Sequence, residues 1–166
     1  MESSSLARAK SKALKLLAAR PRTASELCRR LEREGLGAEA GAVTEWLRGL
    51  GYLDDEAYAR DRAERLVAGG GIGPRLAEAR LVAAGIPESL ARRAVSRALG
   101  PGAEAGRAAA EVERCRELAA RRASRPLAGL EDRERARLAR FLLGRGFSGA
   151  AVSAVLGVAV DDGGGR

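Results

Sequence analysis

The sequence predicts an all-α fold: three tandem three-helix units, each helix-turn-helix-like, that form an elongated, gently curved array. One pattern occurs three times, at residues 27–36, 77–86 and 138–147: two apolar residues four apart, then a glycine four residues later, then another apolar residue. No segment alternates apolar and polar residues convincingly, so we expect no sheet. Aromatic residues make up only 3% of the chain, against 46% hydrophobic residues overall. Alanine, leucine and valine therefore dominate the apolar content, which favours thin, closely packed helices.

Each copy of the pattern is predicted to be the end of a helix. In the first copy, Leu27 and Leu31 are four residues apart and share one helix face. Gly35 suits the left-handed conformation that closes a helix, and the apolar residue after it packs back on the last turn. The spacing is 50 residues from Gly35 to Gly85 and 61 residues from Gly85 to Gly146. A period near 50 with helical content indicates stacked helical units.

The first unit is expected at residues 6–53. An apolar stripe predicts a helix from Leu6 to about Ala18, and Pro21 ends it. Thr23 lies three residues before Glu26, a capping-box signature for the second helix. A third helix ends at the Gly51–Tyr52 pair, and we expect its inward residues to be Ala40, Val43, Trp46, Leu47 and Leu50.

The second unit is expected at residues 54–100. Three acidic residues at 54–56 complement the N–H groups and the dipole of a helix start. The glycine-rich run 69–73 ends this helix, and we interpret it as a flexible joint, because it follows a helix and lacks a Gly-Lys-Ser/Thr ending. Pro74 suits the first position of the next helix, and Pro87 opens the third.

The third unit is expected at residues 103–157, after a Gly-Pro-Gly linker at 100–102. A long helix over about 103–123 and a break at 126–129 account for the wider spacing of its glycine. A helix over about 131–145 follows, and Ser148 caps the last one. We expect residues 158–166 to be a disordered tail.

The charge of the chain predicts an interaction with polyanions. The formal net charge is +8 and the isoelectric point is about 10.6. Basic residues outnumber acidic ones in each unit, and most are arginines, whose planar fork suits phosphate and carboxylate contacts. Seven arginines of the second and third units are the predicted surface contacts: Arg75, Arg92, Arg93, Arg97, Arg121, Arg122 and Arg125.

The composition argues against an enzyme. Histidine is absent, which removes the commonest general base and the commonest metal ligand. Cys28 and Cys115 are too far apart for a zinc motif or a disulfide framework. We therefore expect no catalytic, cofactor or metal site. With no signal peptide and no apolar run near 18 residues, we expect a soluble, cytoplasmic protein without membrane contact. We also expect a monomer, because the sequence supplies no obvious dimer seam.

A second function stays open at this point, that of a helix-turn-helix DNA-binding transcription regulator. Residues 21–53 contain a capped helix, a glycine turn and a second helix, which would place Thr44, Glu45 and Arg48 in a major groove. Base-reading Asn and Gln are absent from that helix. Because the same pattern occurs in every unit, it is first of all a packing module.

Three segments resemble the RecX family of recombination regulators. The run 51–59, Gly-Tyr-Leu-Asp-Asp-Glu-Ala-Tyr-Ala, resembles the family signature. Residues 73–86 are similar to the segment that follows it, and residues 141–156 are similar to the last repeat. The resemblance covers roughly residues 11–157. It departs from the family pattern at Leu76, Ala77 and Arg80.

The resemblance implies an array of three-helix repeats, in agreement with the period. It also implies a non-enzymatic protein that binds the RecA recombinase filament on single-stranded DNA, with free DNA as a further partner. Members damp the ATPase and strand-exchange activities of the filament and limit its growth, which places them in DNA recombination and repair. The family has no catalytic residues to transfer to this chain.

Overall fold

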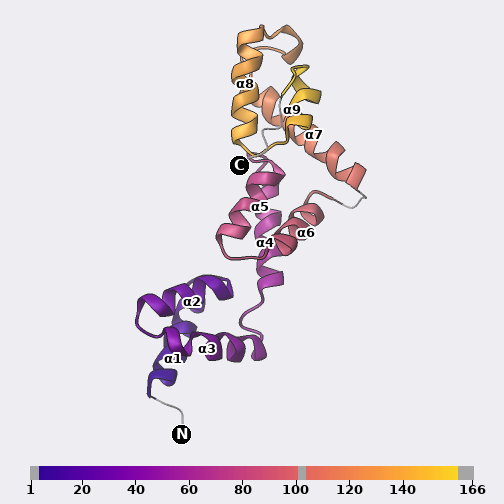
Figure 1. Cartoon of the computed structure of the whole chain (residues 1–166). Helices are drawn as coiled ribbons and strands as arrows, with labels where there is room; N and C mark the ends of the chain where they lie inside the picture. Colours follow the sequence, from indigo (N-terminus) through magenta and orange to yellow (C-terminus); the bar gives the residue numbers. More distant parts are fainter. Residues whose placement is uncertain (1–3, 101–103, 161–166) are drawn as a thin grey trace.

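The computed structural model describes residues 4–100 and 104–160, and within them it confirms the all-α array. These residues form nine α-helices and one short 3₁₀ helix, with no strand. The helices follow one another along an elongated molecule, with α1 near one end and α8 near the other (Figure 1). In order they are α1 (Ser4–Ala19), α2 (Ala24–Arg33), α3 (Gly37–Gly49), α4 (Asp55–Ala68), α5 (Pro74–Ala83), α6 (Glu88–Ala98), α7 (Glu104–Arg122), the 3₁₀ helix η1 (Leu127–Gly129), α8 (Asp132–Gly144) and α9 (Gly149–Leu156).

The buried apolar residues fall into three clusters. The first cluster draws on residues 9–53, the second on 59–95 and the third on 115–156. We therefore propose that the units span 6–53, 54–100 and 103–157. Of the expected tail, residues 161–166 lie outside the described part, whereas Val158 and Val160 pack against the third cluster.

Helix ends built on glycine are confirmed. Gly35, Gly51, Gly85 and Gly146 have φ between +73° and +90°, in the left-handed region. After each glycine, the next N–H donates to a carbonyl one turn back in the helix; the N–H of Ile86, for example, donates to the carbonyl of Leu81 at 3.1 Å. This hydrogen bond defines a Schellman motif.

The inward assignment of Leu50 is wrong. Leu50 is the C-cap of α3 and its side chain is 51% exposed. The chain leaves the helix at this residue, so the helical period no longer points its side chain toward the core. The buried residue at this corner is Leu53, which lies beyond the turn at Gly51.

The middle helices α2, α5 and α8 meet end to end. At the first joint, the Thr23 hydroxyl at the start of α2 donates to the carbonyl of Ala84 at the end of α5 (2.5 Å). At the second joint, the N–H groups of Gly73 and Arg75 donate to the carbonyls of Arg145 (2.7 Å) and Gly146 (3.1 Å). At each joint, N–H or hydroxyl groups at the start of one helix therefore donate hydrogen bonds to carbonyls that have no partner within the helix ending there.

Helix α7 ties the third unit to the second through one face. Arg107, Arg114 and Arg121 are seven residues apart, which is close to two helical turns. Arg107 reaches Ser96 (2.7 Å) and Glu78 (2.5 Å), and Arg114 donates to the carbonyl of Val67 (2.7 Å). Arg121 donates to the carbonyl of Gly70 at 2.9 Å, so α7 also contacts the glycine-rich run 69–73 that follows α4.

Candidate functional site

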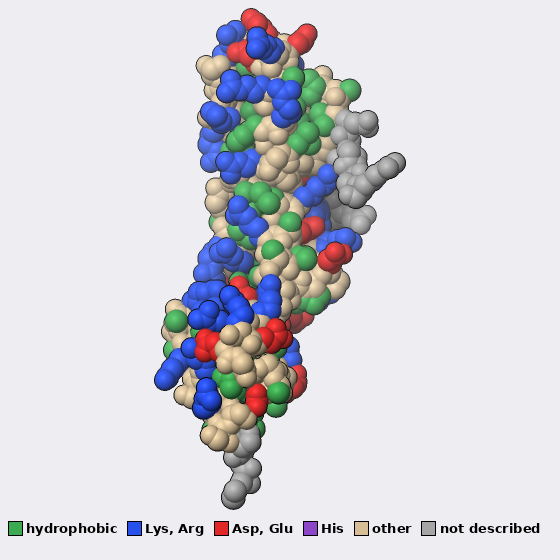
Figure 2. Space-filling view, turned by 60° about the vertical axis from the view of Figure 1, so that its left-hand side comes forward, with side chains coloured by type: hydrophobic (Ala, Val, Ile, Leu, Met, Phe, Trp, Pro, Cys, Tyr) green, Lys and Arg blue, Asp and Glu red, His purple; other side chains and the backbone are tan. Residues whose placement is uncertain are grey.

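The side of the molecule formed by the middle helices is basic. Figure 2 turns this side forward and shows Lys and Arg side chains gathered along the length of the array. We call this surface the basic face and define it by the exposed arginines of α2, α5 and α8 and of the α8 C-cap. They are Arg29, Arg33, Arg75, Arg80, Arg133, Arg137, Arg140 and Arg145.

The predicted arginines of the second unit lie on two helices. Arg92, Arg93 and Arg97 are exposed on α6. The guanidinium group of Arg93 lies 3.6 Å from the Glu56 carboxylate. Within the described residues, the guanidinium groups of Arg92 and Arg97 have no ion pair or hydrogen bond. Arg75 is exposed at the start of α5, beside the end of α8.

The predicted arginines of the third unit lie around the end of α7. Arg121 is held by the carbonyl of Gly70. The Arg122 guanidinium lies 5.5 Å from the centre of the Phe141 ring, and Arg125 lies 3.6 Å from the Glu134 carboxylate. Arg122 and Arg125 therefore border α8, while Arg121 joins two units.

The structure does not gather the seven predicted arginines into one site. Arg93 contacts Glu56 in the first turn of α4, whereas Arg121 contacts Gly70 beyond its last turn. A helix of 14 residues is about 20 Å long. Arg93 and Arg121 therefore lie near opposite ends of α4 and cannot contact one phosphate group together.

The arginines of α8 were missed by the sequence analysis. Arg133, Arg137 and Arg140 follow i, i+4, i+7 spacing and are exposed, and none has an ion pair or hydrogen bond within the described part of the chain. We call these three residues the arginine row. Their spacing was visible in the sequence and could have marked them as one helix face. The half-buried Arg135 differs, because it donates to the carbonyls of Leu130 (2.9 Å) and Leu156 (2.8 Å).

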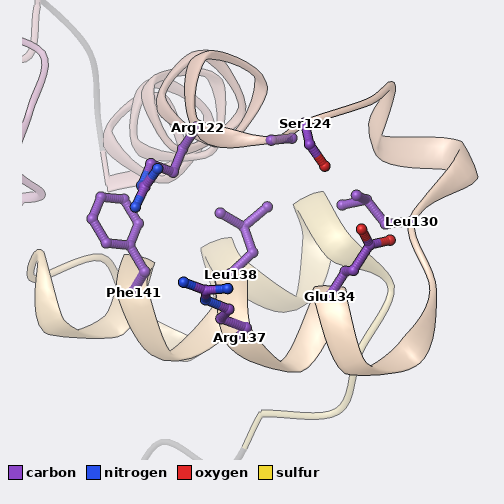
Figure 3. A pocket seen from close by; sticks show the side chains of 8 residues that line it. Arg122, Ser124, Leu130, Glu134, Arg137, Leu138 and Phe141 are labelled. Carbon is purple, nitrogen blue, oxygen red and sulfur yellow. The ribbon is translucent and has the colours of Figure 1, made fainter.

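A pocket of about 310 Å³ lies between the end of α7 and α8 (Figure 3). Leu138 points into its centre from α8, and Arg122 faces Phe141 at one end. Leu130 and Glu134 lie at the other end. The complete lining is Arg122, Ala123, Ser124, Leu130, Glu134, Arg137, Leu138 and Phe141.

The described part of the chain contains one buried thiol with a shifted pKa. Burial, with a smaller contribution from Glu111, raises the pKa of the Cys115 thiol to about 11, so this thiol is neutral at physiological pH. Within residues 4–100 and 104–160, no group of three or more Cys, Asp and Glu side chains is placed to hold a metal ion. Over the same residues, no helix is both long and apolar enough to span a bilayer.

The residues suggested for major-groove contact are engaged within the protein. Thr44 is buried, and its hydroxyl donates to the carbonyl of Gly41 at 2.8 Å. Arg48 forms an ion pair with Glu45 on the same helix and lies 3.8 Å from Asp55. The outward side of α3 therefore presents paired charges.

Comparison with known proteins identifies the family. Residues 9–42 match the model for the first three-helix domain of RecX, and residues 109–156 match the model for its third three-helix domain. The chain is 35% identical over 151 residues to "Regulatory protein RecX" of Leptothrix cholodnii, covering 90% of this chain and 88% of that protein. The chain belongs to the RecX family. A RecX protein of Thermus thermophilus is 34% identical over 139 residues, covering 81% of this chain and 80% of the relative.

Solved RecX structures share the fold. The crystal structure of RecX from Lactobacillus salivarius has a TM-score of 0.71 and 19% identity, over 92% of this chain and 95% of that one. A second RecX crystal structure has the same TM-score and 22% identity, over 93% of this chain and 74% of the other. This chain and the two RecX crystal structures therefore share one fold.

Proposed function

We propose that this chain is a non-enzymatic negative regulator of homologous recombination that binds the RecA filament on single-stranded DNA. In this proposal it inhibits the ATPase, strand exchange and growth of the filament. Membership of the RecX family supports the regulatory role, because the relatives carry the name of regulatory proteins.

The basic face on an elongated array is the observation that carries the proposal. A filament presents the same protein surface and DNA phosphate repeatedly over a long distance, and an extended repeat array offers a matching length of surface. Lys and Arg side chains gather along the length of the array (Figure 2). A net charge of +8 speeds the encounter with such a polyanion and makes the binding sensitive to salt.

Bridging neighbouring protomers is the mechanism we favour. One array that contacts two or more protomers hinders the subunit motion that couples ATP hydrolysis to strand exchange, or blocks addition at a filament end. Arg75 is a proposed contact within the basic face. Further proposed contacts lie outside that face, on α6 and around the end of α7: Arg92, Arg93, Arg97, Arg122 and Arg125. Arg121 stays on this list, with a further role in joining the units.

The first test is the ATPase rate of RecA from the same source on single-stranded DNA, titrated with this protein. A drop at sub-stoichiometric amounts supports end capping, and a drop only near one molecule per protomer supports groove binding. An unchanged rate, with folding confirmed by circular dichroism, would contradict the proposal. Selection of a defined motif from random duplex DNA would then support the transcription-regulator alternative.

The second test reverses two charges on α6. We expect R92E/R93E to weaken filament binding by about tenfold or more without unfolding, because both side chains are exposed. The matched control is R60E/R62E on α4, which changes the net charge equally; Arg60, like Arg93, has only a loose ion pair, here with Asp61 at 3.9 Å. Equal losses in the two variants would show that net charge alone acts and would remove Arg92 and Arg93 from the contact surface.

A further inference from the structure

We propose that the third unit contains a subsite for single-stranded nucleic acid, in which the arginine row binds successive phosphates and the neighbouring pocket holds one unstacked base. The subsite needs no recombinase. It rests on the proposed function for its ligand class and deepens it by assigning single-stranded DNA to particular residues. Its tests use the protein and DNA alone, so their failure is distinguishable from a failure to inhibit the filament.

The arginine row is suited to one extended strand. At 1.5 Å rise per residue, Arg133, Arg137 and Arg140 are about 6 Å and about 4.5 Å apart along the axis of α8. All three guanidinium groups are exposed and have no internal partner within the described residues, so phosphate binding breaks no ion pair. Arginine binds phosphate through two parallel N–H donors, which adds orientation to the attraction.

Arg137 connects the arginine row to the pocket, because it belongs to the row and also lines the pocket (Figure 3). A strand whose phosphates follow the row therefore passes the pocket opening. The volume of about 310 Å³ lies at the lower end of the range of about 300–1,000 Å³ that is usual for small-molecule sites. A single base with part of its sugar is a ligand of suitable size.

The lining of the pocket suits the flat face and polar edge of a base. Leu130 and Leu138 provide apolar surface, and the lining residue Arg122 has its guanidinium group 5.5 Å from the centre of the Phe141 ring. Arg145, outside the lining, lies 5.1 Å from the same ring centre. Planar guanidinium and aromatic groups are the surfaces on which unpaired bases stack. The Ser124 hydroxyl faces the hydrogen-bonding edge, and Glu134, which already accepts the N–H of Glu131 (3.0 Å) and lies 3.6 Å from Arg125, keeps lone pairs for one further donor.

Glu134 argues against an acidic peptide as the occupant. A peptide carboxylate in the pocket would meet the carboxylate of Glu134, and like charges repel. A base donates N–H groups to the same oxygens. Paired duplex bases stay in the stack, so the pocket selects single strands.

The phosphate contacts are tested by fluorescence anisotropy with a labelled single-stranded oligonucleotide over a range of salt concentrations. We expect R133Q/R137Q/R140Q to lower affinity at least about tenfold and to reduce the slope of log affinity against log salt by about 2, since each phosphate contact on a single strand contributes about 0.7. The matched control, R8Q/K15Q/R62Q, removes three exposed charges that have no partner in the described structure. Equal effects of the two variants on the slope would overturn the arginine row as a phosphate site.

The base pocket is tested with an abasic strand, which keeps the phosphates and lacks the bases. We expect the wild-type protein to bind the intact strand at least about fivefold more tightly than the abasic strand. S124W fills the pocket opening and should abolish this preference, whereas S124A should keep it. Equal binding of intact and abasic strands, or tighter binding of an acidic peptide that competes with the strand, would overturn the pocket assignment. Circular dichroism verifies that every variant is folded.

Discussion

Leu81 and Leu142 occupy equivalent places in the second and third units. Both side chains are fully buried, and both carbonyls accept the N–H of the apolar residue after the closing glycine. One residue thus fills the core and also receives the hydrogen bond that closes the helix. The two roles are linked, because the turn that makes the hydrogen bond also brings Ile86 or Phe147 into the same cluster.

Truncating these leucines should be costly. We expect Leu81→Ala and Leu142→Ala each to reduce the free energy of unfolding by about 2–5 kcal/mol, from lost transfer energy and the cavity left behind. Leu50→Ala is the matched control, with an expected change within about 0.5 kcal/mol, since this leucine is half exposed. Urea denaturation measures all three. A Leu50→Ala loss as large as that of Leu81→Ala would show that the assignment of the core is wrong.

At the scale of single residues, the contacts of individual arginines could not be predicted from the sequence. Arg121 and Arg122 are adjacent in sequence and both exposed, yet one donates to Gly70 in another unit and the other lies over Phe141. The carbonyl and ring that decide these roles lie 51 and 19 residues away. Composition predicts a basic surface, but the partner of each guanidinium depends on the packing of the units.

At the scale of elements, helix ends were predictable and helix joints were not. The glycine pattern is local, since each hydrogen bond of the turn joins residues at most five apart, and so the closing turns at Gly35 and Gly85 follow from sequence. The joints depend on pairs such as Thr23 with Ala84, which are 61 residues apart. Gly85 is also a joint residue, because a side chain there would collide with Ser25 of α2.

Three glycine substitutions separate the role in the turn from the role in the joint. Gly35→Ala adds a methyl group in open space at φ +73°, so we expect a loss of about 1–2 kcal/mol from backbone strain alone. Gly85→Ala carries similar strain and the collision with Ser25, so its loss should be larger. Gly41→Ala, inside α3 with open space around it, should stabilise by about 0.4–1 kcal/mol.

Thermal or urea denaturation gives the order of the three variants. Adding Ser25→Gly should remove most of the extra loss of Gly85→Ala, because the colliding atoms are in the Ser25 side chain. If Gly35→Ala and Gly85→Ala cost the same, and Ser25→Gly changes neither, the end-to-end joint between α2 and α5 is not formed in solution.

At the scale of the whole molecule, the array holds its length through two kinds of connection. The middle helices meet end to end, and the face of α7 that carries Arg107, Arg114 and Arg121 lies along the second unit. The three arginines contact α6, α5, the end of α4 and the glycine-rich run 69–73. Both connections are needed for a long rigid surface, because the joint between α8 and α5 rests on a few backbone contacts at Gly73 and Gly146.

Removing the arginine contacts of α7 should loosen the array without unfolding the units. We expect R107A/R114A/R121A to keep its helical circular dichroism, since each core cluster is intact, and to show a larger and more variable solution shape by small-angle X-ray scattering. The control R8A/K15A/R62A, with the same charge change, should keep the wild-type shape. The effect on inhibition is measured with R107A/R114A, which keeps the proposed contact Arg121. If bridging of protomers underlies inhibition, this variant should need more protein for the same drop in ATPase rate, because a flexible array loses more conformational freedom on binding. A wild-type shape for the variant would show that the end-to-end joints alone hold the units in their arrangement. An altered shape with unchanged inhibition would contradict bridging by a rigid molecule.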